Sequence, residues 1–196
     1  MKNVLVRYTL AATLLAVSAS AMAQQPAAEA AARQASFAIQ FWMDSCMTNF
    51  ANPAGVGAFA AKYGLPEAAM QAEVLRNRAG KAWAVVDSER TVYLLAQYAN
   101  GECQVMSRYS DRKTATEALV KIMEIVKSRE PNLIVRRLDD QSFEEPIDAK
   151  LVKYQRISYY VSRNDVPIAW RFRVDTHDTP DVPTQLILAT EPIAKQ

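Results

Sequence analysis

The chain has 196 residues, of which 50% are hydrophobic, and its 23 basic residues almost balance its 21 acidic residues. This length and composition predict a single domain with an ordinary hydrophobic core. Because proteins that bind nucleic acids usually carry a clear basic excess, the near-balance of charge excludes nucleic acid from the expected partners.

Residues 1–23 have the three parts of a cleavable secretory signal. Two basic residues precede an apolar run over residues 8–17, and Ala-Met-Ala follows at 21–23. The apolar run is shorter than the roughly 20 residues that a membrane-spanning helix needs, so we expect no stable membrane insertion. Cleavage after Ala23 would leave a periplasmic or secreted protein with equal numbers of basic and acidic residues.

Residues 24–35 contain no large apolar side chain and predict a flexible leader. The remainder, 36–196, is predicted to form one domain. Within it, apolar residues at intervals of three and four predict an amphipathic helix over 36–50. Capping and proline signals then predict helices over 53–63 and about 66–76.

From residue 81 onward the apolar pattern has the period of strands. The first segments that alternate in this way are 82–86, 91–97 and 102–108. Between the last two, Asn100-Gly101 is typical of a type I′ hairpin turn, in which both central residues need positive φ. A helix follows, with Thr114 and Glu117 as its predicted capping box, and it ends before Pro131.

Four further strands are predicted after this helix. They cover 133–138, 150–161, 166–174 and 184–190. The order of elements predicts an α+β fold: N-terminal helices plus a mainly antiparallel sheet of about seven strands, with one helix inserted between strands three and four. We expect the helices to cover one face of this sheet.

The chain has two cysteines, Cys46 and Cys103. Outside the cytoplasm, an even number of cysteines most simply predicts a disulfide. The alternatives are a redox pair or metal ligands. Redox pairs usually lie close together in sequence, and a zinc site would need more ligands than the single histidine, His177, supplies.

The sequence offers little for catalysis. His177 lies in a polar stretch between two predicted strands and is expected to be a solvated turn residue. The residues that we interpret as turn formers or parts of a solvated loop, rather than as a cation site or paired catalytic acids, are Asp175, Asp178, Asp181, Asp139-Asp140 and Glu144-Glu145. We therefore predict no catalytic set, no cofactor and no metal.

The most suggestive surface feature is the hairpin formed by the strands at 150–161 and 166–174. The side chains that alternate onto one face of it are Tyr154, Arg156 and Tyr160 on the first strand and Arg171 and Arg173 on the second. Tyrosine and arginine are enriched in binding hot spots, so this face is a candidate site for an acidic or aromatic partner. The alternative is that these residues are cross-strand pairs on a solvated face.

Several short elements between residues 37 and 108 resemble a group of small uncharacterised exported proteins of proteobacteria. These elements are Phe41-x4-Cys46-x2-Asn49-Phe50, Asn52-Pro53-x2-Val56-x2-Phe59, Tyr63-Gly64-Leu65, Gly80-Lys81-Ala82-Trp83 and Gly101-Glu102-Cys103-Gln104-Val105. The resemblance implies a Cys46–Cys103 disulfide and a location in the cell envelope. It supplies no catalytic residue.

These observations favour a non-enzymatic periplasmic binding protein. Its expected partner is another envelope or imported protein, which it could inhibit as immunity proteins inhibit interbacterial toxins. The alternatives are a periplasmic module that binds a small molecule, and a hydrolase without a recognisable motif that uses His177 with a nearby aspartate.

Overall fold

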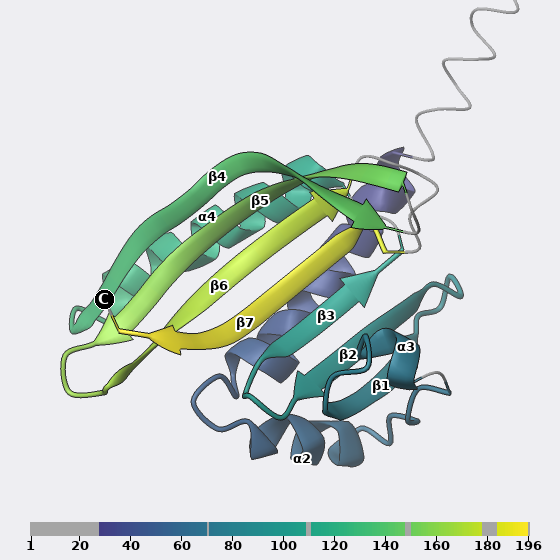
Figure 1. Ribbon diagram of the computed structural model, residues 1–196, viewed down its shortest axis with the longest axis horizontal. Coiled ribbons are helices and arrows are strands. Elements are labelled where there is room, and N and C mark those ends of the chain that lie inside the picture. The colour runs from purple at the N-terminus through teal and green to yellow at the C-terminus, as the bar shows by residue number, and fades with distance from the viewer. Residues whose placement is uncertain (1–27, 70, 109–110, 148–149, 178–183, 196) are drawn as a thin grey trace, which may run out of the picture.

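The computed structural model describes residues 28–69, 71–108, 111–147, 150–177 and 184–195 (Figure 1). The predicted signal peptide, Asp178 and Asp181 lie outside these residues. The strands are β1 (Gly80–Val86), β2 (Val92–Tyr98), β3 (Cys103–Ser107), β4 (Leu133–Ile147), β5 (Lys150–Arg163), β6 (Ile168–His177) and β7 (Leu186–Ala194). The helical elements are residues 28–42, the π-helical η1 (Met43–Met47), α2 (Ala54–Lys62), α3 (Gln71–Val74) and α4 (Arg112–Arg129).

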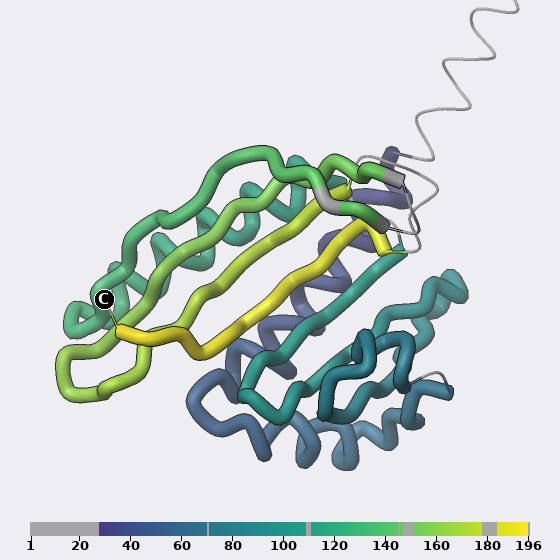
Figure 2. Tube along the Cα trace, viewed as in Figure 1, coloured from purple at the N-terminus to yellow at the C-terminus, as the bar shows by residue number. Residues whose placement is uncertain are grey.

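The seven strands form one sheet in the order β1-β2-β3-β7-β6-β5-β4, and every neighbouring pair is antiparallel. The chain builds β1–β3 as a meander and then crosses behind the sheet through α4 (Figures 1 and 2). From the far edge, β4–β7 return as a second meander until β7 pairs with β3. The predicted α+β fold, with one helix between strands three and four, is confirmed.

The N-terminal helix covers one face of the sheet and includes part of the predicted leader. Residues 28–35 are helical rather than a flexible leader. Alanine has the highest helix propensity, and the small side chains of Ala35 and Ala38 are fully buried against the core, so no large apolar residue is needed there. At the end of this helical region Cys46 forms a disulfide with Cys103, with their Cα atoms 5.5 Å apart.

Helix α4 covers the same face beside β4–β6. Its buried stripe is Ala115, Leu119 and Met123. The predicted capping box is wrong, because the N-cap is Asp111, whose carboxylate accepts a hydrogen bond of 2.7 Å from the Thr114 backbone N–H. Asp111 supplies the acceptor that the first turn of a helix needs.

The turn between β2 and β3 places Glu102 directly before β3. Gly101 has a positive φ of 90°, whereas Asn100 does not, so the predicted type I′ turn is wrong in detail. The backbone N–H of Tyr98 donates to the Glu102 carbonyl at 2.8 Å, and the Asn100 side chain accepts from the Glu102 N–H at 3.1 Å. This pattern matches a hairpin loop with glycine in the left-handed position.

The opposite face of the sheet carries a second, smaller core. Here Leu75 and Ala68, on either side of α3, pack against Ala82, Ala96 and their neighbours. The expected third helix is therefore a single turn, and the expectation that the helices share one face is wrong for α3. Over β4–β7 this face has no helix in front of it among the described residues (Figure 1).

Strand β4 is longer than predicted and includes the acidic pairs that were expected in a solvated loop. Their neighbours on β5 explain this difference. Asp139 accepts a hydrogen bond from the Ser158 hydroxyl, and Glu144 lies 3.3 Å from the Lys153 ammonium group. Cross-strand polar pairs of this kind stabilise a strand. The sequence of such a strand is too polar for its apolar alternation to predict it.

Candidate functional site

The face of the sheet opposite α4 brings together all of the predicted binding residues. The register of β5 and β6 pairs Tyr160 with Arg171 and Arg156 with Asp175. The intervening residues of β6, Trp170 and Phe172, point into the main core, as predicted. Alternation along two neighbouring strands therefore builds one polar surface, which we call the arginine face.

Arg156 is held firmly on this face by Asp175. Its Nε and Nη2 atoms donate to the two carboxylate oxygens at 2.7 and 2.8 Å. Only 20% of the Arg156 side chain and 5% of the Asp175 side chain are exposed. The bidentate hydrogen bond to Asp175 raises the pKa of Arg156 further above its already high ordinary value, so this residue stays charged.

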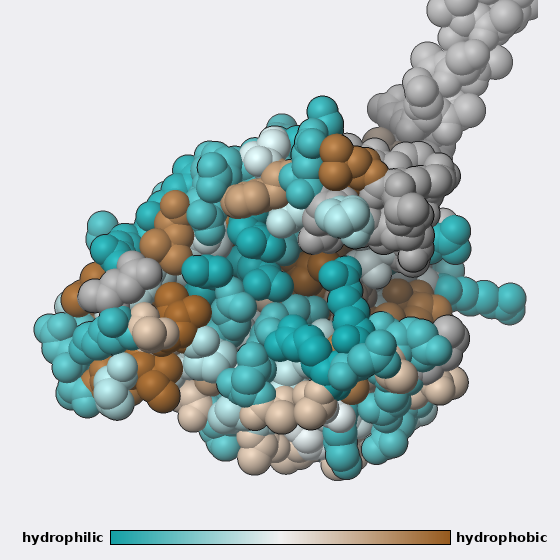
Figure 3. Space-filling model, viewed as in Figure 1, coloured by the Kyte–Doolittle hydropathy of each residue, from teal (hydrophilic) through white to brown (hydrophobic). Residues whose placement is uncertain are grey.

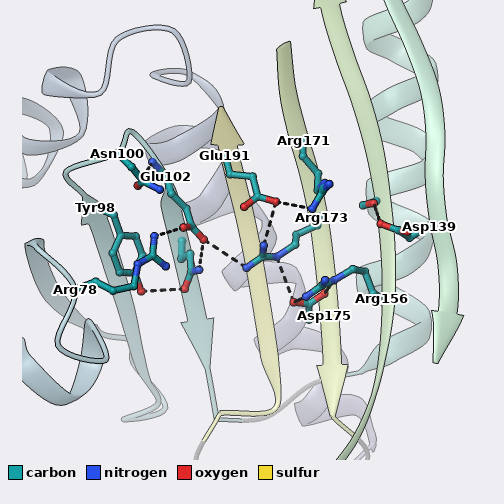
Figure 4. A network of polar contacts seen from close by, with 12 residues as sticks. Arg78, Tyr98, Asn100, Glu102, Asp139, Arg156, Arg171, Arg173, Asp175 and Glu191 are labelled. Atoms are coloured by element: carbon teal, nitrogen blue, oxygen red, sulfur yellow. Dashed lines mark hydrogen bonds and ion pairs between the residues drawn. The ribbon is translucent and has the colours of Figure 1, made fainter. Parts of the chain in front are cut away.

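Arg173 lies at the centre of the face and contacts three carboxylates (Figure 4). Its guanidinium group is 3.4 Å from Glu102, 3.2 Å from Asp175 and 3.1 Å from Glu191. Glu191 also lies 3.2 Å from Arg171. The side chain of Arg173 is 13% exposed, so these ion pairs are only weakly screened by water.

Glu102 connects this centre to the first meander. Its carboxylate also pairs with Arg78 and accepts a hydrogen bond from the Gln104 amide. The guanidinium of Arg78 lies over the ring of Tyr98, 3.8 Å from the ring centroid. Ion pairs and a cation–π contact thus run without interruption from the β1–β3 meander to the β4–β7 meander.

Two acids of the network, Glu102 and Asp175, are almost fully buried. The Glu102 and Asp175 carboxylates are 5% exposed, whereas the side chain of Arg78 is 43% exposed. Each of these two carboxylates is neutralised by two guanidinium groups, Glu102 by Arg78 and Arg173 and Asp175 by Arg156 and Arg173. Figure 3 shows the result as a band of hydrophilic residues across the middle of this side of the molecule.

A hollow of about 200 Å³ opens in this band between α3 and the floor of the sheet. The chain after α3 supplies one wall with Arg76 and Arg78, and β5 and β6 supply the other with Arg156 and Arg173. Among the described residues Arg76 has no ion-pair partner, and its charge adds to a site in which guanidinium groups outnumber carboxylates.

The structure corrects three expectations about this region. His177 is not a solvated turn residue, because β6 extends to it and leaves it 4% exposed beside Tyr154. Asp175 is not a turn former but the buried partner of Arg156. Tyr160 is only 2% exposed beneath Arg136, so this tyrosine supports the face rather than offering contact area.

The residues that sequence reasoning missed lie on the chain after α3, on β2 and β7, and in or directly before β3: Arg76, Arg78, Tyr98, Glu102, Gln104 and Glu191. The alternation of Glu102 and Gln104 with Cys103 and Val105 was the available signal. No group of three or more histidine, cysteine, aspartate or glutamate side chains that could hold a metal ion occurs among the residues described.

Burial and the neighbouring Glu102 carboxylate raise the pKa of the Tyr98 phenol. Because the pKa of this phenol is higher in the folded state than in the unfolded chain, its contribution to stability is fully present below the unfolded pKa of about 10. The contribution is lost as the pH rises through the folded-state pKa. We therefore expect the free energy of unfolding to fall above about pH 10, and to fall less steeply in Tyr98→Phe. Urea denaturation between pH 8 and 11 measures both slopes; equal slopes would contradict the assignment.

Comparison of the chain with models of protein families, with curated proteins and with solved structures gives no match. None of the helices in the described ranges is long and apolar enough to cross a membrane.

Proposed function

We propose that this chain is a non-enzymatic binding protein of the bacterial periplasm that holds another protein on its arginine face. The observation that carries the proposal is the convergence of Arg76, Arg78, Arg156, Arg171 and Arg173 on one side of the sheet. The predicted secretory signal and the Cys46–Cys103 disulfide support an oxidising location outside the cytoplasm.

The ion pairs support a binding role because they fix the shape of the surface before a partner arrives. Arg156 is bound to Asp175 through Nε and Nη2, and Arg173 is held by three carboxylates. Side chains that are already immobilised lose little conformational entropy on association. Arginine is also among the residues that most often dominate the energy of protein interfaces.

A protein partner also fits the dimensions of the surface. The hollow of about 200 Å³ is smaller than the 300–1,000 Å³ typical of sites that enclose a small organic ligand. The arginine face extends beyond it, across β5, β6 and β7 to Arg171 and Glu191. An inhibitor of another envelope or imported protein, comparable to an immunity protein, would use such a face to cover its target.

Affinity capture of the tagged mature protein from its own periplasm tests this proposal. We expect one stoichiometric protein to bind to the wild type and to Lys121→Glu, which changes an exposed residue of α4 on the other side of the sheet. The variant Arg171→Glu should lose it, because its new carboxylate lies beside Glu191. Circular dichroism confirms that each variant is folded. An empty capture, or equal capture by all three proteins, would refute the proposal.

A further inference from the structure

We infer that the hollow beside α3 is a carboxylate-binding subsite, which takes an acidic side chain of the protein partner. The inference rests on the proposed function and assigns the chemistry of the group that anchors the partner. It is carried by the guanidinium groups that line the hollow, by its size and by the backbone that forms its wall.

The ion-pair network does not use all of the guanidinium N–H donors that line the hollow. Arg156 uses Nε and Nη2 for Asp175, so its Nη1 is available, and Arg78 uses Nη2 for Glu102. The guanidinium of Arg76 has no carboxylate partner among the described residues. A planar fork of N–H donors matches the two oxygens of a carboxylate, which makes arginine the preferred residue for this group.

The wall that carries Arg76 has an unusual backbone. Arg76 and Asn77 have positive φ values of 51° and 58°, a left-handed conformation that residues other than glycine rarely adopt. This turn brings Arg76 and Arg78 to the same hollow. Such conformations are costly and are concentrated at binding sites, where the surrounding structure holds them in place.

The size and the other lining residues point to an acidic side chain. A hollow of about 200 Å³ accommodates one side chain rather than a drug-sized ligand. Tyr98, Tyr154 and the apolar atoms of Met106 line it together with the arginines, so the methylene groups of a glutamate would lie against apolar surface while its carboxylate meets Arg76 and Arg78. The acids Glu73 and Asp175 in the lining are outnumbered by the four arginines.

N-acetylglutamate amide is a defined probe for this subsite, and N-acetylglutamine amide is its neutral isostere. Titration of the ¹⁵N-labelled mature protein with the charged probe should shift the arginine Nε–H signals and the Tyr98 amide in a saturable manner, and the neutral probe should not. We expect Arg76→Gln to weaken binding by at least about tenfold, the loss typical of a hydrogen bond to a charged group. Arg76 is the residue to change because no ion pair of the network depends on it.

Arg90→Gln is the matched control. Arg90 is also an arginine with a positive φ, 62°, but it does not line this hollow. Its substitution should leave the affinity for the probe unchanged. Equal responses to the charged and neutral probes, or equal loss in both variants, would overturn the inference while leaving the proposed function to the capture experiment.

The capture experiment repeated with Arg76→Gln distinguishes the source of the carboxylate. Reduced capture of the partner by Arg76→Gln, and its release from the wild type by excess N-acetylglutamate amide, support an acidic side chain of the partner. If binding of the probe requires Arg76 but capture of the partner does not, the carboxylate does not come from a side chain of the partner. The subsite then binds free carboxylates instead. If the probe binds but no protein is captured, the proposed function and a partner's side chain as the source of the carboxylate are both refuted. The hollow would still be a carboxylate-binding subsite.

Discussion

Removal of the disulfide by the double substitution Cys46→Ser/Cys103→Ser is expected to lower the free energy of unfolding by about 4 kcal/mol. The bridge closes a loop with a sequence separation of 57 residues, and its loss restores that freedom to the unfolded chain. Both cysteines are buried against the main core, so the serines add the cost of two polar groups there. Urea denaturation of the oxidised wild type and of the variant measures the difference.

Reductant provides the internal control for this measurement. It should destabilise the wild type to nearly the level of the double variant and leave the variant unchanged. A wild type that keeps its midpoint in reductant, with the bond shown to be open by thiol titration, would mean that the bridge contributes little to stability.

Substitution of Arg173 by methionine is expected to cost about 3 kcal/mol, the lower end of the range for breaking a buried ion pair. Glu102, Asp175 and Glu191 would each lose one counter-ion, although each retains another arginine. Methionine preserves much of the side-chain volume, so the change reports mainly on charge. Urea denaturation at neutral pH gives the magnitude.

Arg33→Met is the matched control for this prediction. Arg33 is an exposed arginine that pairs with Glu89, so its substitution should have little effect on stability. Equal losses of stability in Arg33→Met and Arg173→Met would contradict the buried ion pairs as the source of the cost.

Much of the fold was predictable because it depends on local patterns. The stripe of α4, the turn at Gly101 and the alternation of Arg171 and Arg173 with core residues all follow from neighbours within a few positions. The same locality explains the correct assignment of the predicted binding residues to one face. The role of that face in binding stays a prediction.

The composition of the candidate site was not predictable, because sheet order decides it. Glu102 and Arg173 are 71 residues apart in sequence. They meet because β7 pairs with both β3 and β6 and so joins the two meanders into one sheet. Periodicity reveals which face a residue occupies but not which strand lies next to it. The same limit explains Asp175, which follows the predicted end of its strand and precedes a segment rich in aspartate and proline.

The contacts of Arg173 affect which register of the strands is stable. Two of its three carboxylates come from other parts of the sheet, Glu102 from the residue before β3 and Glu191 from β7, so β3, β7 and β6 must be aligned for these contacts to form. A slip of β7 by one residue would turn Glu191 to the helix-covered face and bring Thr190 in its place. The guanidinium group would then lie beside an uncharged hydroxyl, which is far less favourable in a buried site. Arg173 thus discriminates against misaligned pairings of the same strands, so the network specifies one alignment of the sheet.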